Sequence, residues 1–222
     1  MEFNKELKSK HYIQNLIEEG EHERQDFKFK ISDARKIARS ISAFANNSGG
    51  CLLIGVKDNG KVAGVESDEE MYMIEQAAEM YCRPSQKVQF QSYRVEGKSV
   101  LKVDVKPATD LPVKAQDDDK KWRAYYRVAD ENILASALHV KVWAEMKKET
   151  PSLITFSEKE QILIEYLSEY NSITLDEYMK IAHLSKHLAE ETIIKMCIMN
   201  TLEIRYICGR CVLVLKNEEM NL

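Results

Sequence analysis

The chain has 222 residues, and its 32 Lys and Arg against 36 Asp and Glu give a formal net charge of -4. Hydrophobic residues make up 44% and charged residues 31%, a balance that is typical of globular proteins and excludes disordered, collagen-like and low-complexity chains. No apolar run approaches the roughly 18 residues of a membrane span, and the first residues lack the apolar core of a signal peptide. We therefore expect a cytoplasmic protein that has no membrane partner.

Helices and strands are predicted to alternate along the first 150 residues. Apolar spacing and cap residues indicate helices over 11–18, 32–48, 69–80 and 133–148. Alternating segments and turn residues indicate strands over 25–29, 51–56, 61–65, 88–96, 99–105 and 124–128. The helix after Ser32 has the clearest pattern, because its apolar residues recur along one face until Gly49-Gly50 ends it.

A second domain is predicted to follow a break near Thr150-Pro151-Ser152, because Pro151 disfavours a helical residue before it. The domains are therefore expected to span 1–150 and 151–222. Helix caps and a turn in the second domain are indicated by Ser157 with Glu160, Thr174 with Glu177, Ser185, and Gly209-Arg210. Three helices followed by a tight hairpin form a winged-helix-like arrangement.

The charge of this second domain bears on its role. Residues 151–222 hold 7 basic and 11 acidic side chains, so phosphates would be repelled. We expect the domain to pack, to form a homodimer or to bind a protein. Contact of the hairpin with DNA through Arg205 and Arg210 is the alternative.

Two acids and a lysine lie at the first predicted strand. If residues 25–29 form a strand, Asp26 and Lys28 share one face, and Glu21 lies just upstream. Such a set can bind a divalent cation and orient a phosphate. The alternative is a solvated strand edge that carries ordinary charges.

The most specific motif of the chain joins the predicted central helix to the strand after it. It contains Phe44-Ala45-Asn46, Gly49-Gly50 and Ile54-Gly55-Val56. Together with Gly20-Glu21, Phe27-Lys28 and the later Tyr125-Tyr126-Arg127-Val128, it resembles the Schlafen AlbA_2 domain family, which is also called divergent AAA-4. The resemblance covers roughly residues 11–140. It implies an α+β fold, with a mixed sheet and flanking helices, followed here by the small winged-helix-like domain.

The resemblance implies two functions. In nuclease members of the family, two acids of the first motif and one acid after the Gly-Gly strand form a metal-dependent RNA-cleaving site. By position these are Glu21, Asp26 and Asp58, with Lys28 beside them and Mg or Mn as the cofactor. The usual second Glu is Asp26 here, so metal distances set for Glu need not be met. Many other members are nucleic-acid-binding regulators, so we favour a transcriptional regulator and keep the endoribonuclease as the alternative.

Basic residues near the motif are candidates for contact with DNA or RNA. Residues 21–64 hold 8 Lys and Arg against 5 Asp and Glu. Phosphate contacts are expected from Lys28, Arg35, Arg39, Lys57 and Arg127. A solvated helix face is the alternative for the basic residues of the central helix. The aromatic residues Trp122, Tyr125 and Tyr126 either stack on bases or pack against the sheet.

Two further motifs leave alternatives open. The segment 55–61 fits the start of a phosphate-binding loop, which makes an ATP-binding protein the second alternative function. Against it, Val62 replaces the magnesium-binding Ser or Thr, and Asn59-Gly60 predicts a hairpin. Cys208 and Cys211 form a CxxC pair, which either binds zinc with His183 and His187 or flanks a hairpin turn as small apolar residues.

Overall fold

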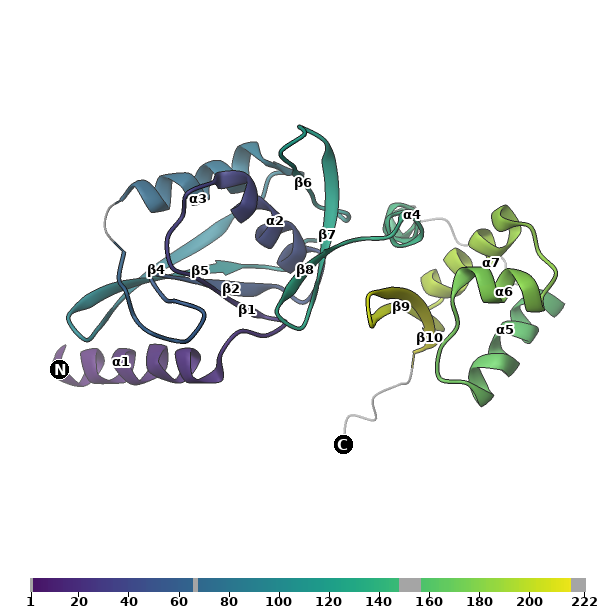
Figure 1. The fold of residues 1–222 in the computed structure, drawn as a ribbon, viewed down its shortest axis with the longest axis horizontal. Helices are drawn as coiled ribbons and strands as arrows, with labels where there is room; N and C mark the ends of the chain where they lie inside the picture. The colour runs from purple at the N-terminus through teal and green to yellow at the C-terminus, as the bar shows by residue number, and fades with distance from the viewer. Residues whose placement is uncertain (1, 66–67, 148–156, 217–222) are drawn as a thin grey trace. The chain divides into compact units, whose positions relative to one another are not determined.

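The computed structural model describes residues 2–65, 68–147 and 157–216. The chain forms two compact units, Met1–Ala135 and Ser136–Leu222 (Figure 1). Both helices and strands are present in each unit, which confirms the predicted α+β class. Within the described residues, none of the helices combines the length and the apolarity that a membrane span requires.

The first unit contains a mixed four-stranded sheet in the order β1-β2-β5-β4. Its strands are β1 (Gln25–Lys28), β2 (Gly50–Ile54), β5 (Lys98–Val105) and β4 (Val88–Val95). β1 runs parallel to β2, and the other neighbours are antiparallel. Because β1 lies at an edge, one side of its backbone is available to partners outside the sheet.

A second, antiparallel sheet has the order β3-β6-β7-β8. Its strands are β3 (Cys82–Arg83), β6 (Lys114–Gln116), β7 (Trp122–Val128) and β8 (Glu131–Leu134). The register places Arg83 opposite Lys114, and Gln116 opposite Trp122. Residues that are distant in the sequence thus become neighbours on this sheet.

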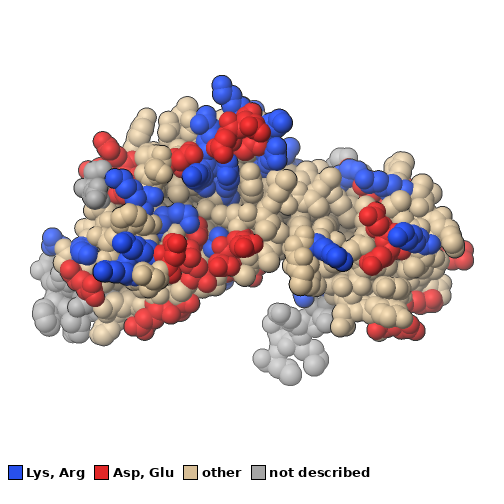
Figure 2. Space-filling model, viewed as in Figure 1, with Lys and Arg blue, Asp and Glu red and all other residues tan. Residues whose placement is uncertain are grey.

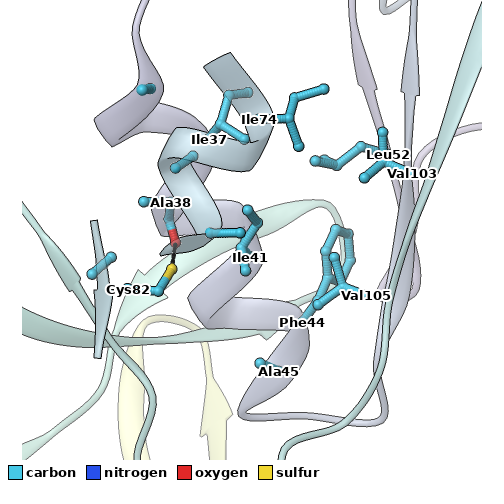
Figure 3. Close-up of a cluster of buried hydrophobic side chains, with 14 of the residues drawn as sticks. Ile37, Ala38, Ile41, Phe44, Ala45, Leu52, Ile74, Cys82, Val103 and Val105 are labelled. Carbon is cyan, nitrogen blue, oxygen red and sulfur yellow. Dashed lines mark hydrogen bonds between the residues drawn. The ribbon is translucent and has the colours of Figure 1, made fainter. Parts of the chain in front are cut away.

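Helix α2 (Ala34–Ala45) packs between the two sheets, where its predicted apolar stripe is buried (Figure 3). Its Ile41 and Phe44 share a core with Leu52 of the first sheet and Cys82 of the second. Asp33, rather than Ser32, caps the helix, since the Asp33 carboxylate accepts a hydrogen bond from the backbone N–H of Arg35. Helix α3 (Glu69–Met80) adds Ile74 and Ala77 to the same core.

Helix α1 (Glu2–Glu19) covers the opposite face of the first sheet. Its Ile13 packs with Phe27 and Leu53, both of which are almost fully buried. Side chains of a strand alternate between faces, so Leu52 reaches the α2 side and Leu53 the α1 side. β2 is therefore buried on both faces, as its unbroken apolar sequence indicates.

The motif of Phe44-Ala45-Asn46 and Gly49-Gly50 connects α2 to both sheets. A Cβ atom on Gly50 would lie 2.5 Å from the Phe44 ring and 2.7 Å from the carbonyl oxygen of Arg24, so only glycine fits. The side chain of Asn46 accepts a hydrogen bond from the N–H of Val113 at 2.7 Å and donates to the carbonyl oxygen of Tyr125 at 2.8 Å. The motif thus ties α2 to both sheets at once.

The second unit contains helices followed by a hairpin. Its elements are α4 (Ala137–Met146), α5 (Glu158–Glu169), α6 (Leu175–Ile181), α7 (Lys186–Ile198), β9 (Leu202–Ile207) and β10 (Arg210–Leu215). Both predicted capping boxes are present, and Ser185 caps α7 as expected. An isolated bridge between Ile173 and Leu213 attaches the segment before α6 to the hairpin.

Three predictions about the elements need correction. The boundary between units falls at Ala135 and Ser136, and not near residue 150, because Leu138 and Val142 of α4 pack into the core of the second unit. The predicted helix over 133–148 begins only at Ala137, since Ile133 and Leu134 belong to β8. The predicted returning strand over 61–65 is reduced to a single bridge between Val56 and Val62. Residues 150–152 lie outside the described residues.

Candidate nucleic-acid interface

The acidic motif on β1 forms a buried ionic cluster. As predicted, Asp26 and Lys28 share one face of β1, and the Lys28 Nζ lies 2.8 Å from Asp26 Oδ2. The Asp26 side chain is 4% exposed. The Ser40 hydroxyl of α2 donates to the same oxygen at 3.2 Å. Asp26 is therefore held from both its own strand and the central helix.

Arg127 of β7 completes this cluster from inside the unit. Its guanidinium lies 3.5 Å from Asp26 Oδ1 and donates to the backbone oxygen of Gln25 at 3.1 Å and to Asn132 Oδ1 at 3.0 Å. The side chain is only 1% exposed, so a phosphate in solvent has no access to it. The sequence-based expectation that Arg127 contacts nucleic acid is thus corrected: this arginine joins β1 to β7 and β8.

Glu21 approaches the same strand from the preceding loop. Its carboxylate accepts a hydrogen bond from the backbone N–H of Phe27 at 2.8 Å, on the free edge of β1. Burial, followed by the hydrogen bond to Asp26, raises the pKa of Glu21, whereas the Phe27 N–H acts to lower it. Two carboxylates thus lie together, as the sequence predicted.

We expect Glu21→Gln to change how stability depends on pH. The folded protein binds the Glu21 proton more tightly than the unfolded chain does, so the free energy of unfolding falls as pH rises from the ordinary pKa through the raised one. Glutamine cannot ionise and keeps an acceptor for Phe27. Urea unfolding should show the variant gaining stability relative to wild type between pH 4 and pH 7. If the difference in unfolding free energy between the variant and wild type is the same at pH 4 and at pH 7, the carboxylate pair is refuted. Glu79→Gln, at an exposed position, is the control.

Asp58 does not join the two carboxylates. It is exposed in the turn after β2, and no group of three or more His, Cys, Asp or Glu side chains suited to a metal ion occurs within residues 2–65, 68–147 and 157–216. Lys57, in the same turn, places its Nζ 5.0 Å from the centre of the Phe29 ring. The predicted set Glu21, Asp26 and Asp58 is therefore gathered only in part.

Neither of the other two motifs assembles a site. No helix follows directly after Lys61, as a phosphate-binding loop requires, because Val62 pairs with Val56. Cys208 is exposed, and the Cys211 sulfur lies 3.2 Å from the Ser136 hydroxyl oxygen. Within the part of the chain that the structure describes, these cysteines form no metal-binding group with His183 or His187.

A second candidate site is a basic surface, which we call the basic face. Figure 2 shows Lys and Arg side chains gathered around a small acidic group, at the end of the first unit where Figure 1 places the β6–β7 hairpin. The basic face surrounds the β6–β7 end of the second sheet. Its residues are Arg83 and Lys114 on one face of the sheet, Arg35, Arg39 and Arg123 on the α2 side, and Lys120 and Lys121 in the turn. The strand register sets Arg83 beside Lys114, and the Arg83 guanidinium lies 4.1 Å from the centre of the Trp122 ring. The basic face therefore combines cations with an aromatic ring.

An acidic turn, Asp117 to Asp119, lies within the basic face. Asp118 accepts a hydrogen bond from Arg39 at 2.7 Å, and Asp117 forms an ion pair with Arg123 at 2.7 Å. The Asp118 side chain is 66% exposed, so its pair with Arg39 is open to solvent and to competing anions. These contacts also bring α2 and the β6–β7 turn together.

The sequence indicated this surface only in part. Arg35 and Arg39 were predicted from the polar side of the central helix, but Arg83, Lys114 and Arg123 were not. Their proximity arises from the pairing of the short strands β3 and β6 with β7. Lys120-Lys121 directly before Trp122 is the one local signal that could have identified the surface from the sequence.

Comparison with protein families finds one match. The family described as Schlafen, AlbA_2 matches residues 21–136, which include β1, Gly49-Gly50 and the basic face. Among curated proteins, none matches the chain.

The solved structures that match the chain include the two that follow. The crystal structure of the DIP2311 protein from Corynebacterium diphtheriae has 20% identity and a TM-score of 0.44, and the match covers 77% of this chain and 32% of that chain. The solution structure of the N-terminal domain of a RecG-related protein from Nitrosomonas europaea has 17% identity and a TM-score of 0.36. That match covers 61% of this chain and 84% of the other.

Proposed function

Since the chain belongs to the Schlafen AlbA_2 family, we propose that it is a nucleic-acid-binding protein whose basic face contacts the phosphates of DNA or RNA. The observation that carries the proposal is the gathering of cations from α2, β3, β6 and β7 around the β6–β7 end of the second sheet, with Arg83 and Lys114 on one of its faces and Arg123 on the α2 side. Such a surface releases counterions from a polyanion when it binds, which supplies affinity without reading sequence.

The basic face replaces most of the contacts that the sequence indicated. Arg35 and Arg39 remain in the proposed set. Lys28 is paired with Asp26, Arg127 is buried, and Lys57 lies against Phe29 in a different turn. The Glu21–Asp26 pair is better explained as support for the edge of β1 than as a nuclease centre, because its carboxylates accept bonds from the fold itself.

We also propose that the second unit is winged-helix-like and serves in dimerisation, within a transcriptional regulator. The order of α5, α6 and α7 before the β9–β10 hairpin supports the first part. Charge supports the second part of the proposal. Residues 151–222 carry more acidic than basic side chains, and carboxylates of the same unit hold Lys195 of α7, through Glu160, and Lys141, through Glu190. Analytical ultracentrifugation of the full chain tests the dimer.

Salt titration tests the nucleic-acid proposal. Filter binding of a labelled oligonucleotide at several salt concentrations should give a linear fall of log K with log salt, with a slope of about 0.7 to 0.9 for each phosphate contact. Binding that is independent of salt, or no binding at low salt, would contradict the proposal.

Asp118→Asn is expected to tighten binding. The change removes a negative charge that competes with phosphate for Arg39, and the exposed side chain allows it without damage to the fold. An exposed pair contributes about 0.5 to 1 kcal/mol, so the Kd at low salt should fall roughly two- to fivefold. Asp130→Asn, at the exposed turn on the other end of β7, is the control. Equal or weaker binding by Asp118→Asn would place the interface elsewhere.

A further inference from the structure

One aromatic residue of the basic face has no role in the hydrophobic cores. Trp122 belongs to none of the hydrophobic clusters formed by the described residues, whereas Tyr125 on the same strand packs against the main core. Trp122 is half-buried, and Arg83, which covers its ring at 4.1 Å, is exposed. The half-buried indole therefore lies outside the hydrophobic clusters, with an exposed guanidinium stacked on its ring.

We infer that the Arg83–Trp122 stack is a base-stacking platform, which makes single-stranded DNA or RNA the preferred ligand of the basic face. This inference rests on the proposed nucleic-acid-binding function and adds the class of ligand. Both the indole ring and the guanidinium plane stack on nucleobases, and every base offers a flat face to them. In a duplex these faces are covered by neighbouring base pairs, so the platform acts only on unpaired bases.

The surroundings of the platform suit a single strand. Lys114 lies beside Arg83 in the strand register, and Lys120 and Lys121 precede Trp122 in the β6–β7 turn. Cations thus lie on both sides of the Arg83–Trp122 stack. A single nucleic-acid strand whose bases stack there would carry its phosphates past these cations. This is the combination of a basic track and an aromatic ring that single-strand binding proteins use.

Three helices of the described residues, α2, α3 and α7, are poorly suited to the groove of a duplex. The helix that bears Arg35 and Arg39, α2, is buried between two sheets along most of its length. α3 begins with Glu69 and Glu70, and α7 carries Glu190 and Glu191. Major-groove binding needs an exposed helix with basic and polar side chains, so these elements do not favour duplex DNA.

Tryptophan emission and oligonucleotide competition test the platform. Oligothymidine, oligouridine and a DNA duplex of equal length are titrated into the full chain at one salt concentration. We expect both single strands to bind at least fivefold more tightly than the duplex and to quench tryptophan emission. Trp122→Phe should lose most of this quenching, because the only other tryptophan, Trp143, is buried in the second unit.

Two substitutions separate stacking from charge. Trp122→Ala should weaken single-strand binding about fivefold to a hundredfold and change duplex binding less than twofold. Arg83→Lys keeps the charge and removes the planar group, so it should lower the preference for single strands while duplex binding is kept. Circular dichroism confirms that both variants are folded.

The outcomes distinguish the inference from the proposed function. If single strands and duplex bind equally, with salt dependence, and Trp122→Ala weakens both to the same extent, the platform is refuted while the basic face stands. If none of the three probes binds, both are refuted.

Discussion

Replacing Lys114, Lys120 and Lys121 together by alanine is expected to weaken nucleic-acid binding on the order of thirtyfold at low salt. Three cations of the basic face are lost, Lys120 and Lys121 exposed and Lys114 half-buried, each contributing about 0.5 to 1 kcal/mol with a phosphate, which sums to about 2 kcal/mol. The slope of log K against log salt should fall by about 0.7 for each contact that is removed, if the ligand is single-stranded. Fluorescence anisotropy at several salt concentrations measures both quantities.

A matched variant separates location from net charge. Replacing Lys57, Lys61 and Lys180 by alanine removes the same charge from exposed positions outside the basic face. This control should bind almost as tightly as wild type. Because Lys57 was itself a candidate from the sequence, a stronger loss in the control than in the basic-face variant would restore the surface near β2 as the interface.

Replacing Arg127 by methionine is expected to destabilise the protein by about 3 to 5 kcal/mol. The change leaves the buried Asp26 without one of its cations. It also removes the side-chain donor to the backbone oxygens of His22 and Gln25, which keep only their backbone N–H donors. Breaking a buried pair by removing one partner costs this much because the remaining charge stays buried. Urea unfolding followed by circular dichroism measures the loss.

A double-mutant cycle tests the assignment. The combined Asp26→Asn and Arg127→Met variant should be less destabilised than the sum of the single variants, by more than about 1 kcal/mol, because the two residues share one network. Arg94→Met, at an exposed arginine of β4, should change stability by less than about 0.5 kcal/mol. Additive single effects would show that Asp26 and Arg127 are not coupled.

Local elements were predictable because their signals are local. The apolar stripe of α2, the turn at Gly97 between β4 and β5, and the capping boxes of α5 and α6 depend on residues within a few positions of each other. Alternation along β1 likewise placed Asp26 and Lys28 on one face, and their ion pair confirms it. Short-range periodicity and capping chemistry thus determine much of this fold.

Long-range pairing was not predictable from the same signals. The strands β3 and β6 have two and three residues, too few for periodicity to show, yet they bring Arg83 and Lys114 together. The burial of Arg127 was also missed, because nothing in Tyr125-Tyr126-Arg127-Val128 distinguishes an inward arginine from an outward one. The helix α4 belongs to the second unit because Leu138 and Val142 pack with core residues that lie beyond residue 157 in the sequence.

The most direct test of the basic face is a map of backbone amide shifts on titration of the full chain with oligothymidine. We expect the largest changes at Arg83, over 114–116 and over 120–123, with the β1 cluster around Asp26 nearly unchanged. Changes confined to the turn around Lys57, or to the β9–β10 hairpin with Arg205 and Arg210, would contradict the account.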